Sequence, residues 1–118
     1  MPSDKPARRL LDIIENAQTI ARYIEGMDGI AFEENTLVSD AVERCLERIS
    51  EAMAKLGDQA AVLLPTQPWH KIKAFGNVLR HEYDDILKPR LWDIVQNDLP
   101  PLLSASEAAL QKLQETTK

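Results

Sequence analysis

The stretch from Asn35 to Gly57, NTLVSDAVERCLERISEAMAKLG, decides the fold class, because its apolar residues recur every three or four positions. These residues form one stripe: Leu37, Val38, Ala41, Val42, Cys45, Leu46, Ile49, Met53 and Leu56. Asn35 or Thr36 can cap the start of a helix, and Gly57 can end it. Charged residues fill the opposite face. The stretch therefore predicts a long amphipathic helix with one face in a core.

A similar stripe precedes this helix. It consists of Leu10, Ile13, Ile14, Ala17, Ile20, Ala21 and Ile24. Pro6 fits the first turn of a helix and Gly26 fits its C-terminal cap, so a first amphipathic helix is predicted between them. Residues 27–34 are predicted to be a connecting loop, because Asp28-Gly29 is a turn signal.

Prolines divide the second half of the chain. Residues 58–67 carry at most one helical turn, since Pro65 and Pro68 interrupt the apolar pattern. A third long helix is predicted to begin at Pro68 and to end at Pro89. Its core stripe is predicted to contain Trp69, Ile72, Phe75, Leu79, Tyr83 and Ile86.

The last apolar stripe is interrupted by two adjacent prolines. Residues 90–97 are helical by pattern, and Asp98 is predicted to cap a fresh helix that holds Pro100 and Pro101 in its first turn. We therefore expect the last helix to be kinked or broken at Pro100-Pro101. No segment alternates as a strand does. The predicted fold is all-α, an antiparallel four- to five-helix bundle formed by residues 1–118 as one domain.

Composition limits the class of protein. The chain has 118 residues, 44% of them apolar, which is enough to bury one core. It contains no run of roughly 20 apolar residues that could span a bilayer, and its N-terminus lacks the apolar part of a signal peptide, so we expect a cytoplasmic protein. Cys45, the single cysteine, lies on an apolar stripe and is expected to be a buried free thiol.

The charge is negative overall but unevenly distributed. A net charge of -5 argues against a general nucleic-acid coat, and we expect no DNA partner. Between Trp69 and Arg90, however, five basic residues stand against three acidic ones. This local excess fits either a small cationic groove that touches a few phosphates or ordinary surface scatter.

Ionisable and aromatic residues are concentrated in the segment Phe75-Gly76-Asn77-Val78-Leu79-Arg80-His81-Glu82-Tyr83. It is entered through Pro68-Trp69 and is followed by Leu91-Trp92-Asp93-Ile94-Val95-Gln96-Asn97-Asp98-Leu99-Pro100. These tracts resemble the HepT-like family of HEPN-domain toxins, in which the motif usually reads arginine, asparagine, three residues, histidine, any residue, tyrosine. Asn77, His81 and Tyr83 match that motif, whereas Gly76 stands where the arginine belongs.

The resemblance extends to the helix between Asn35 and Gly57. Arg44, Leu46, Glu47, Ile49, Glu51 and Ala52 are similar to the family's second-helix tract. Ser50 replaces a frequent glycine there, and Arg48 replaces a position that is usually apolar.

The resemblance implies a ribonuclease whose site is made by the arginine and the histidine of the motif. Metal-free RNA cleavage requires a base that takes the proton of the 2'-hydroxyl and an acid that protonates the leaving oxygen. It also requires a positive charge that stabilises the negative charge developing on the phosphorane. His81 is the candidate acid-base residue, and Asn77 and Tyr83 are candidates to orient the reacting groups. Arg80 can lean back over the turn vacated at Gly76 and act as the phosphate clamp. The alternative is a surface ion pair between Arg80 and Asp84.

On a helix, His81 projects roughly opposite Leu79, onto a face of small and polar residues. The other members of this face are His70, Ala74, Asn77 and Asp85. Such a face suits the close approach of a second copy in a homodimer with a polar cleft, and the alternative is a solvated face with a surface histidine. His70 and Lys73 are the candidate RNA-binding residues.

Neither a metal nor another cofactor is expected. The two histidines lie eleven residues apart, no cysteine or carboxylate cluster completes a ligand set, and no phosphate-binding glycine loop is present. Any chemistry should therefore be histidine acid-base chemistry.

Tyr83 has two interpretations, since it either packs in the core or presents its hydroxyl at the edge of the cleft. In the family that the chain resembles, the corresponding tyrosine accepts AMP from a minimal nucleotidyltransferase antitoxin, which silences the toxin. Three hypotheses follow. The protein is a metal-independent endoribonuclease toxin, or a catalytically weakened HEPN protein that is the partner and AMPylation substrate of a nucleotidyltransferase, or a structural bundle without a site.

Overall fold

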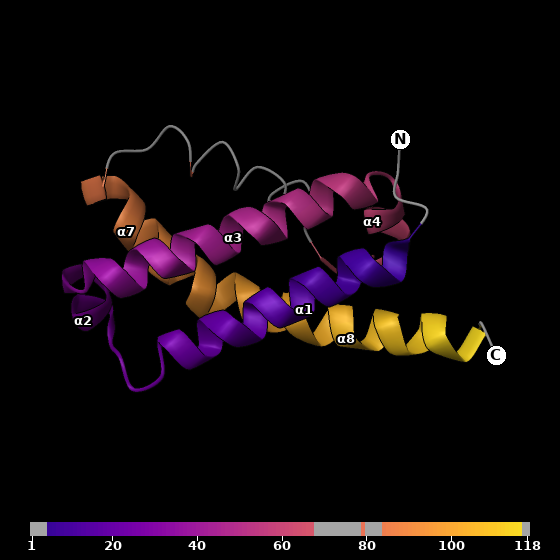
Figure 1. Ribbon diagram of the computed structural model, residues 1–118, viewed down its shortest axis with the longest axis horizontal. Helices are drawn as coiled ribbons and strands as arrows, with labels where there is room; N and C mark the ends of the chain where they lie inside the picture. The colour runs from indigo at the N-terminus through magenta and orange to yellow at the C-terminus, as the bar shows by residue number, and fades with distance from the viewer. Residues whose placement is uncertain (1–4, 68–78, 80–83, 117–118) are drawn as a thin grey trace.

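The computed structural model describes residues 5–67, 79 and 84–116, and these are helical except for short connections (Figure 1). The elements in order are α1 Pro6–Tyr23, α2 Gly29–Glu34, α3 Thr36–Leu56, α4 Gln59–Leu63, α7 Asp84–Asp93, the π-helical turn η1 Ile94–Asp98 and α8 Leu99–Thr116. The described residues contain no strand, which confirms the predicted all-α class.

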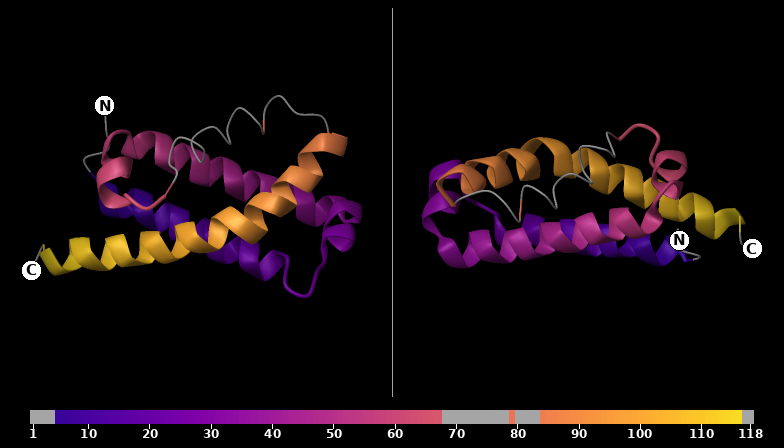
Figure 2. Two further views of the ribbon diagram at one scale, coloured as in Figure 1. Left: turned by 180° about the vertical axis from the view of Figure 1, so that it is seen from behind. Right: turned by 90° about the horizontal axis from the view of Figure 1, so that it is seen from above.

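Helices α1 and α3 run antiparallel, and α8 packs along α1 (Figures 1 and 2). Local sequence signals fix three of these ends as predicted, whereas α1 ends at Tyr23 with Ile24, and not Gly26, as its C-cap. Pro6 occupies the first turn of α1, and the Asn35 side chain accepts a hydrogen bond of 3.1 Å from the Val38 amide at the start of α3. Gly57 ends α3 with a φ of 56°, a conformation that glycine adopts without strain.

Every described helix contributes buried residues to the core, many of them from α1, α3 and α8. Fully buried members include Leu10, Ile13, Ile20, Leu46, Ile49, Met53, Leu56 and Leu102. Those of α1 and α3 occupy the predicted stripes, so the three- and four-residue spacing identified the inward faces of these two helices correctly. Two stripe residues were predicted wrongly. Ala21 is exposed and Leu37 is 82% exposed.

The connection between α1 and α3 was also predicted wrongly. It contains the short helix α2 rather than a loop. The Asp28 carboxylate caps this helix by accepting a hydrogen bond of 2.8 Å from the Ala31 amide, and Phe32 is completely buried. Burial of one aromatic ring against α7 therefore stabilises a helix that is too short to form alone.

Pro89 does not end a helix, contrary to the prediction. It lies inside α7, and the buried side chains of Leu87 and Leu91 lie one turn apart on either side of it. Proline removes one backbone hydrogen bond, but packing of the flanking leucines keeps the chain helical.

The irregularity expected at Pro100-Pro101 takes the form of the π-helical turn η1 directly before them. The chain does not break there, and Figure 2 shows α7, η1 and α8 as one continuous, bent run. The Leu99 amide bonds the Ile94 carbonyl, five residues back. Pro100 and Pro101 cannot donate backbone hydrogen bonds, and their rings would clash with the carbonyls four residues earlier in a regular α-helix. A wider π-helical turn directly before them relieves this clash. No described helix has the length and apolar character needed to cross a membrane.

Candidate functional site

Most of the predicted catalytic segment lies outside the described residues. This applies to all the candidate site residues, namely His81, Arg80, Tyr83, Asn77, Lys73 and His70, and to Gly76. Their roles therefore stay predictions. The structure describes Leu79 within the segment and the elements on both sides of it.

Leu79 lies two positions before His81, and its side chain is only 8% exposed. It belongs to the hydrophobic core together with residues of α1, α3 and α8, which confirms its predicted place on the core stripe.

Helix α7, which follows the His81 segment in the chain, is fixed by contacts with α2. The rings of Phe32 and Trp92 lie 5.2 Å apart and are tilted by 38°. A Cβ atom at Gly29 would lie 3.1 Å from Nε1 of Trp92, so a glycine allows α2 to approach this closely. The Lys88 ammonium also donates a hydrogen bond of 3.4 Å to the Glu33 carbonyl. These contacts fix the position of α7, which begins one residue after Tyr83.

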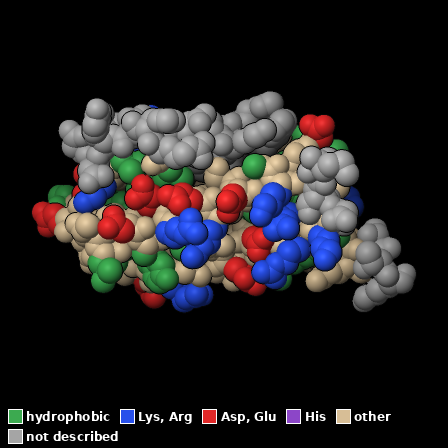
Figure 3. Space-filling view, turned by 45° about the horizontal axis from the view of Figure 1, so that its top comes forward, with side chains coloured by type: hydrophobic (Ala, Val, Ile, Leu, Met, Phe, Trp, Pro, Cys, Tyr) green, Lys and Arg blue, Asp and Glu red, His purple; other side chains and the backbone are tan. Residues whose placement is uncertain are grey.

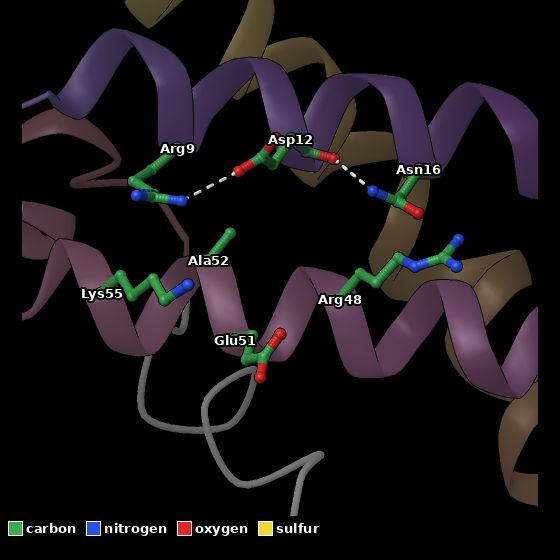
Figure 4. A pocket seen from close by; sticks show the side chains of 7 residues that line it. All are labelled: Arg9, Asp12, Asn16, Arg48, Glu51, Ala52 and Lys55. Atoms are coloured by element: carbon green, nitrogen blue, oxygen red, sulfur yellow. Dashed lines mark hydrogen bonds and ion pairs between the residues drawn. The ribbon is translucent and has the colours of Figure 1, made fainter.

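A shallow groove of about 180 Å³ runs between α1 and α3 (Figure 4). It is lined by Arg9, Asp12 and Asn16 from α1 and by Arg48, Glu51, Ala52 and Lys55 from α3. Ala52 is 1% exposed, and its small side chain leaves space between the longer polar ones. Because the helices are antiparallel, Arg9 lies near Lys55 at one end of the groove, and Asn16 lies near Arg48 at the other.

Asp12 is the centre of a hydrogen-bonded network on the α1 side of this groove. Its carboxylate pairs with the guanidinium of Arg8 at 3.2 Å and with that of Arg9 at 3.3 Å. The Asn16 side chain donates a hydrogen bond of 2.8 Å to the Asp12 carbonyl. Two cations thus neutralise one carboxylate. Nε of Arg9 is buried and has no acceptor within the part of the chain that the structure describes.

Groups with nucleophilic or metal-binding chemistry are few in the described ranges. Cys45 is a buried free thiol, as predicted. Burial raises the pKa of the Cys45 thiol, while the nearby guanidinium groups of Arg48 and Arg44 act in the opposite direction. Within residues 5–67, 79 and 84–116, no three His, Cys, Asp or Glu side chains converge as metal ligands do.

A family model described as Ribonuclease HepT-like matches residues 13–109. The chain belongs to the HepT-like ribonuclease family. The matched region extends from α1 into α8 and includes the whole His81 segment. The family resemblance inferred from the motif is thus confirmed.

Proteins similar to this HepT-like chain carry ribonuclease names. "Putative RNase MJ1380" of Methanocaldococcus jannaschii is 32% identical over 93 residues, which cover 79% of this chain and 85% of that protein. "Putative RNase MJ0125" of the same organism is 26% identical over 115 residues, which cover 98% and 99% of the two chains. "Putative RNase TTE0752" of Caldanaerobacter subterraneus subsp. tengcongensis is 29% identical over 107 residues, or 91% and 96%. No solved structure matches the chain significantly.

The groove was not predicted from the sequence. Its charged α3 residues belong to the face opposite the apolar stripe, and nothing in a single helix indicates which residues of another helix lie opposite. One signal was available: Arg48 stands at a position of the HepT-like tract that is usually apolar. A long cationic side chain at a usually apolar position indicates that this part of α3 faces a polar surface.

Proposed function

We propose that this HepT-like protein is a metal-independent endoribonuclease and the toxin component of a toxin-antitoxin pair. The observation that carries the proposal is the family match over residues 13–109, which includes the Asn77, His81 and Tyr83 motif. The ribonuclease names of its relatives support RNA as the substrate.

In the proposed reaction, His81 takes the proton of the 2'-hydroxyl or protonates the leaving oxygen, since imidazole titrates in the range that both steps need. The 2'-hydroxyl itself is the nucleophile, so no covalent enzyme intermediate is required. Arg80 stabilises the charge that develops on the phosphorane, while Asn77 and Tyr83 orient the reacting groups. His70 and Lys73 contact the RNA.

The proposed active form is a homodimer in which the His81 faces of two copies form one cleft. Small and polar residues on that face of the predicted helix, Ala74 and Asn77 among them, support this arrangement. A minimal nucleotidyltransferase is the proposed antitoxin and transfers AMP to Tyr83. The added phosphodiester is negatively charged and would repel RNA from the cleft.

The deciding experiment is RNA cleavage by the purified protein in EDTA, with the His81→Ala variant as the control. We expect cleavage by the wild type and a loss of about 10² to 10⁴ in rate for the variant, the range that a general acid-base typically contributes. Equal rates for both proteins would remove His81 from the reaction, and absence of cleavage would reject the enzyme.

The replacement of the family arginine by Gly76 favours a second candidate, a catalytically weakened HEPN protein that serves as partner and AMPylation substrate of the nucleotidyltransferase. Two variants separate the candidates. If Arg80 supplies the charge, Arg80→Ala should cost on the order of 10² in rate, and Gly76→Arg should bring no gain. If the site is disabled, Gly76→Arg should raise the rate and Arg80→Ala should be neutral.

A further inference from the structure

We propose that the groove between α1 and α3 binds the backbone of a single-stranded RNA, through residues that are not part of the His81 segment. The inference rests on the proposed ribonuclease function and assigns it a second contact surface. Its described lining supplies three cations, Arg9, Arg48 and Lys55, against two carboxylates, Asp12 and Glu51. On a chain with a net charge of -5, such a local cationic excess is a place where RNA phosphates can bind.

The carboxylate of Asp12 does not cancel the cations that line the groove. It already pairs with Arg9 inside the groove and with Arg8 at its edge, so each of these guanidiniums is only partly neutralised. Figure 3 shows several Lys and Arg side chains gathered on the right half of this view, with Asp and Glu side chains between them. Cationic and acidic side chains are therefore interspersed on this face of the molecule.

Several donors in the groove are available to a ligand. Lys55 and Arg48 are exposed and have no carboxylate partner in the described ranges. A guanidinium offers two parallel donors to a phosphate, and an ammonium offers a point charge.

The spacing of the cations in the groove fits the phosphates of a single-stranded RNA better than it fits one compact anion. Arg48 and Lys55 are seven positions apart in one helix, which places them about 10 Å apart along its axis. A stacked strand advances about 3.4 Å per nucleotide, so the two cations can contact phosphates roughly three nucleotides apart. Glu51 lies between them and can accept hydrogen bonds from ribose hydroxyls or base amino groups, which lie between phosphates in RNA.

The test is binding of a fluorescein-labelled single-stranded RNA of about twelve nucleotides, within the usual range of single-strand sites, measured by anisotropy at several salt concentrations. All proteins carry His81→Ala so that the RNA stays uncut. The groove variant is Arg48→Ala with Lys55→Ala. The control is Arg22→Ala with Lys112→Ala, which removes the same charge from exposed residues outside the groove.

Each lost phosphate contact should weaken binding about tenfold at about 50 mM salt and flatten the slope of log affinity against log salt by about 0.7. We therefore expect the groove variant to lose about a hundredfold in affinity and about 1.4 in slope, and the control to change little. Equal losses in both double variants would overturn the groove assignment.

The outcomes also separate this inference from the proposed function. If the wild type cleaves RNA in EDTA while the groove variant binds RNA as the control does, the groove fails and the ribonuclease stands. If the wild type neither binds nor cleaves RNA, the function fails and the groove fails with it. If the groove variant instead loses only its affinity for the nucleotidyltransferase, the groove is a protein interface and the RNA assignment is wrong.

Discussion

Replacement of Phe32 by alanine tests whether α2 is a packed helix or a loop that merely connects α1 to α3. The Phe32 ring is completely buried and lies 5.2 Å from the ring of Trp92 on α7. Truncation of a buried phenylalanine costs about 3–5 kcal/mol in the free energy of unfolding. For a chain of this length, 1 kcal/mol corresponds to about 4 °C, so we expect Tm to fall by about 12–20 °C.

Urea and thermal denaturation, both monitored by circular dichroism, measure the free energy of unfolding and Tm, with Ile30→Ala as the matched control. Ile30 lies on the same short helix but is 69% exposed, so its truncation should change the free energy of unfolding by no more than about 0.5 kcal/mol. If residues 29–34 were a loose connection, both variants would cost a similar, small amount. A loss below about 1 kcal/mol for Phe32→Ala would contradict the packing described here.

The aromatic contact itself is measured by a double-mutant cycle. Phe32→Leu and Trp92→Leu keep apolar side chains at both positions and remove the ring pair, so their coupling energy isolates the contact between α2 and α7. We expect a coupling of about 0.5–1.5 kcal/mol. Additive effects would mean that the two rings are only neighbours, and that burial alone holds α7 against α2.

Four further outcomes are expected. Ser106→Ala should raise the free energy of unfolding by about 1 kcal/mol, because the buried Ser106 hydroxyl has no partner in the described residues. Exposed Ser104→Ala is its control. The buried Cys45 thiol should react with a disulfide reagent only after unfolding. Because the pKa of this thiol is raised in the folded state, the free energy of unfolding should fall as pH rises above the ordinary thiol value of 9.0. The Cys45→Ala variant should lack this pH dependence. Sedimentation should show a dimer at micromolar concentration, and a monomer would reject the shared cleft. Co-expression with the nucleotidyltransferase should place AMP on Tyr83 by mass spectrometry, and AMP on another residue would reject that acceptor.

The long helices were predictable because their signals are local. Periodic apolar residues, the Asn35 cap and the terminating Gly57 all act within a few residues of each other, and apart from the exposed Ala21 and Leu37 they appear in the structure where they were expected. Such signals need no knowledge of the rest of the chain. The all-α class followed from them directly.

The errors arose where distant contacts override local preference. Residues 27–34 have a turn signal, but Phe32 finds Trp92 sixty positions later and stabilises a helix. Pro89 is a helix breaker by itself, yet Leu87 and Leu91 hold the chain against the core on both sides of it. These distant packing contacts cannot be recognised in a short stretch of the sequence.

The two candidate surfaces illustrate the same distinction. The His81 segment was found from a motif, since its residue types and spacing carry the chemistry, and only Leu79 within it is tested by the structure. The groove consists of side chains from α1 and α3 that are about forty positions apart. It became visible only when the antiparallel packing of the two helices placed Arg9 near Lys55.

The groove and the proposed Arg80 clamp would affect different kinetic constants. A groove that holds RNA equally well before and during the reaction lowers KM without raising kcat. A guanidinium that touches the developing phosphorane charge raises kcat. The groove therefore cannot replace the arginine that the family carries at the position of Gly76, however tightly it binds RNA. A chain with an intact groove and no clamp would bind RNA at full affinity and cleave it slowly. A low kcat with a normal KM would therefore identify the catalytically weakened protein. A raised KM would instead indicate that RNA binding in the groove is impaired.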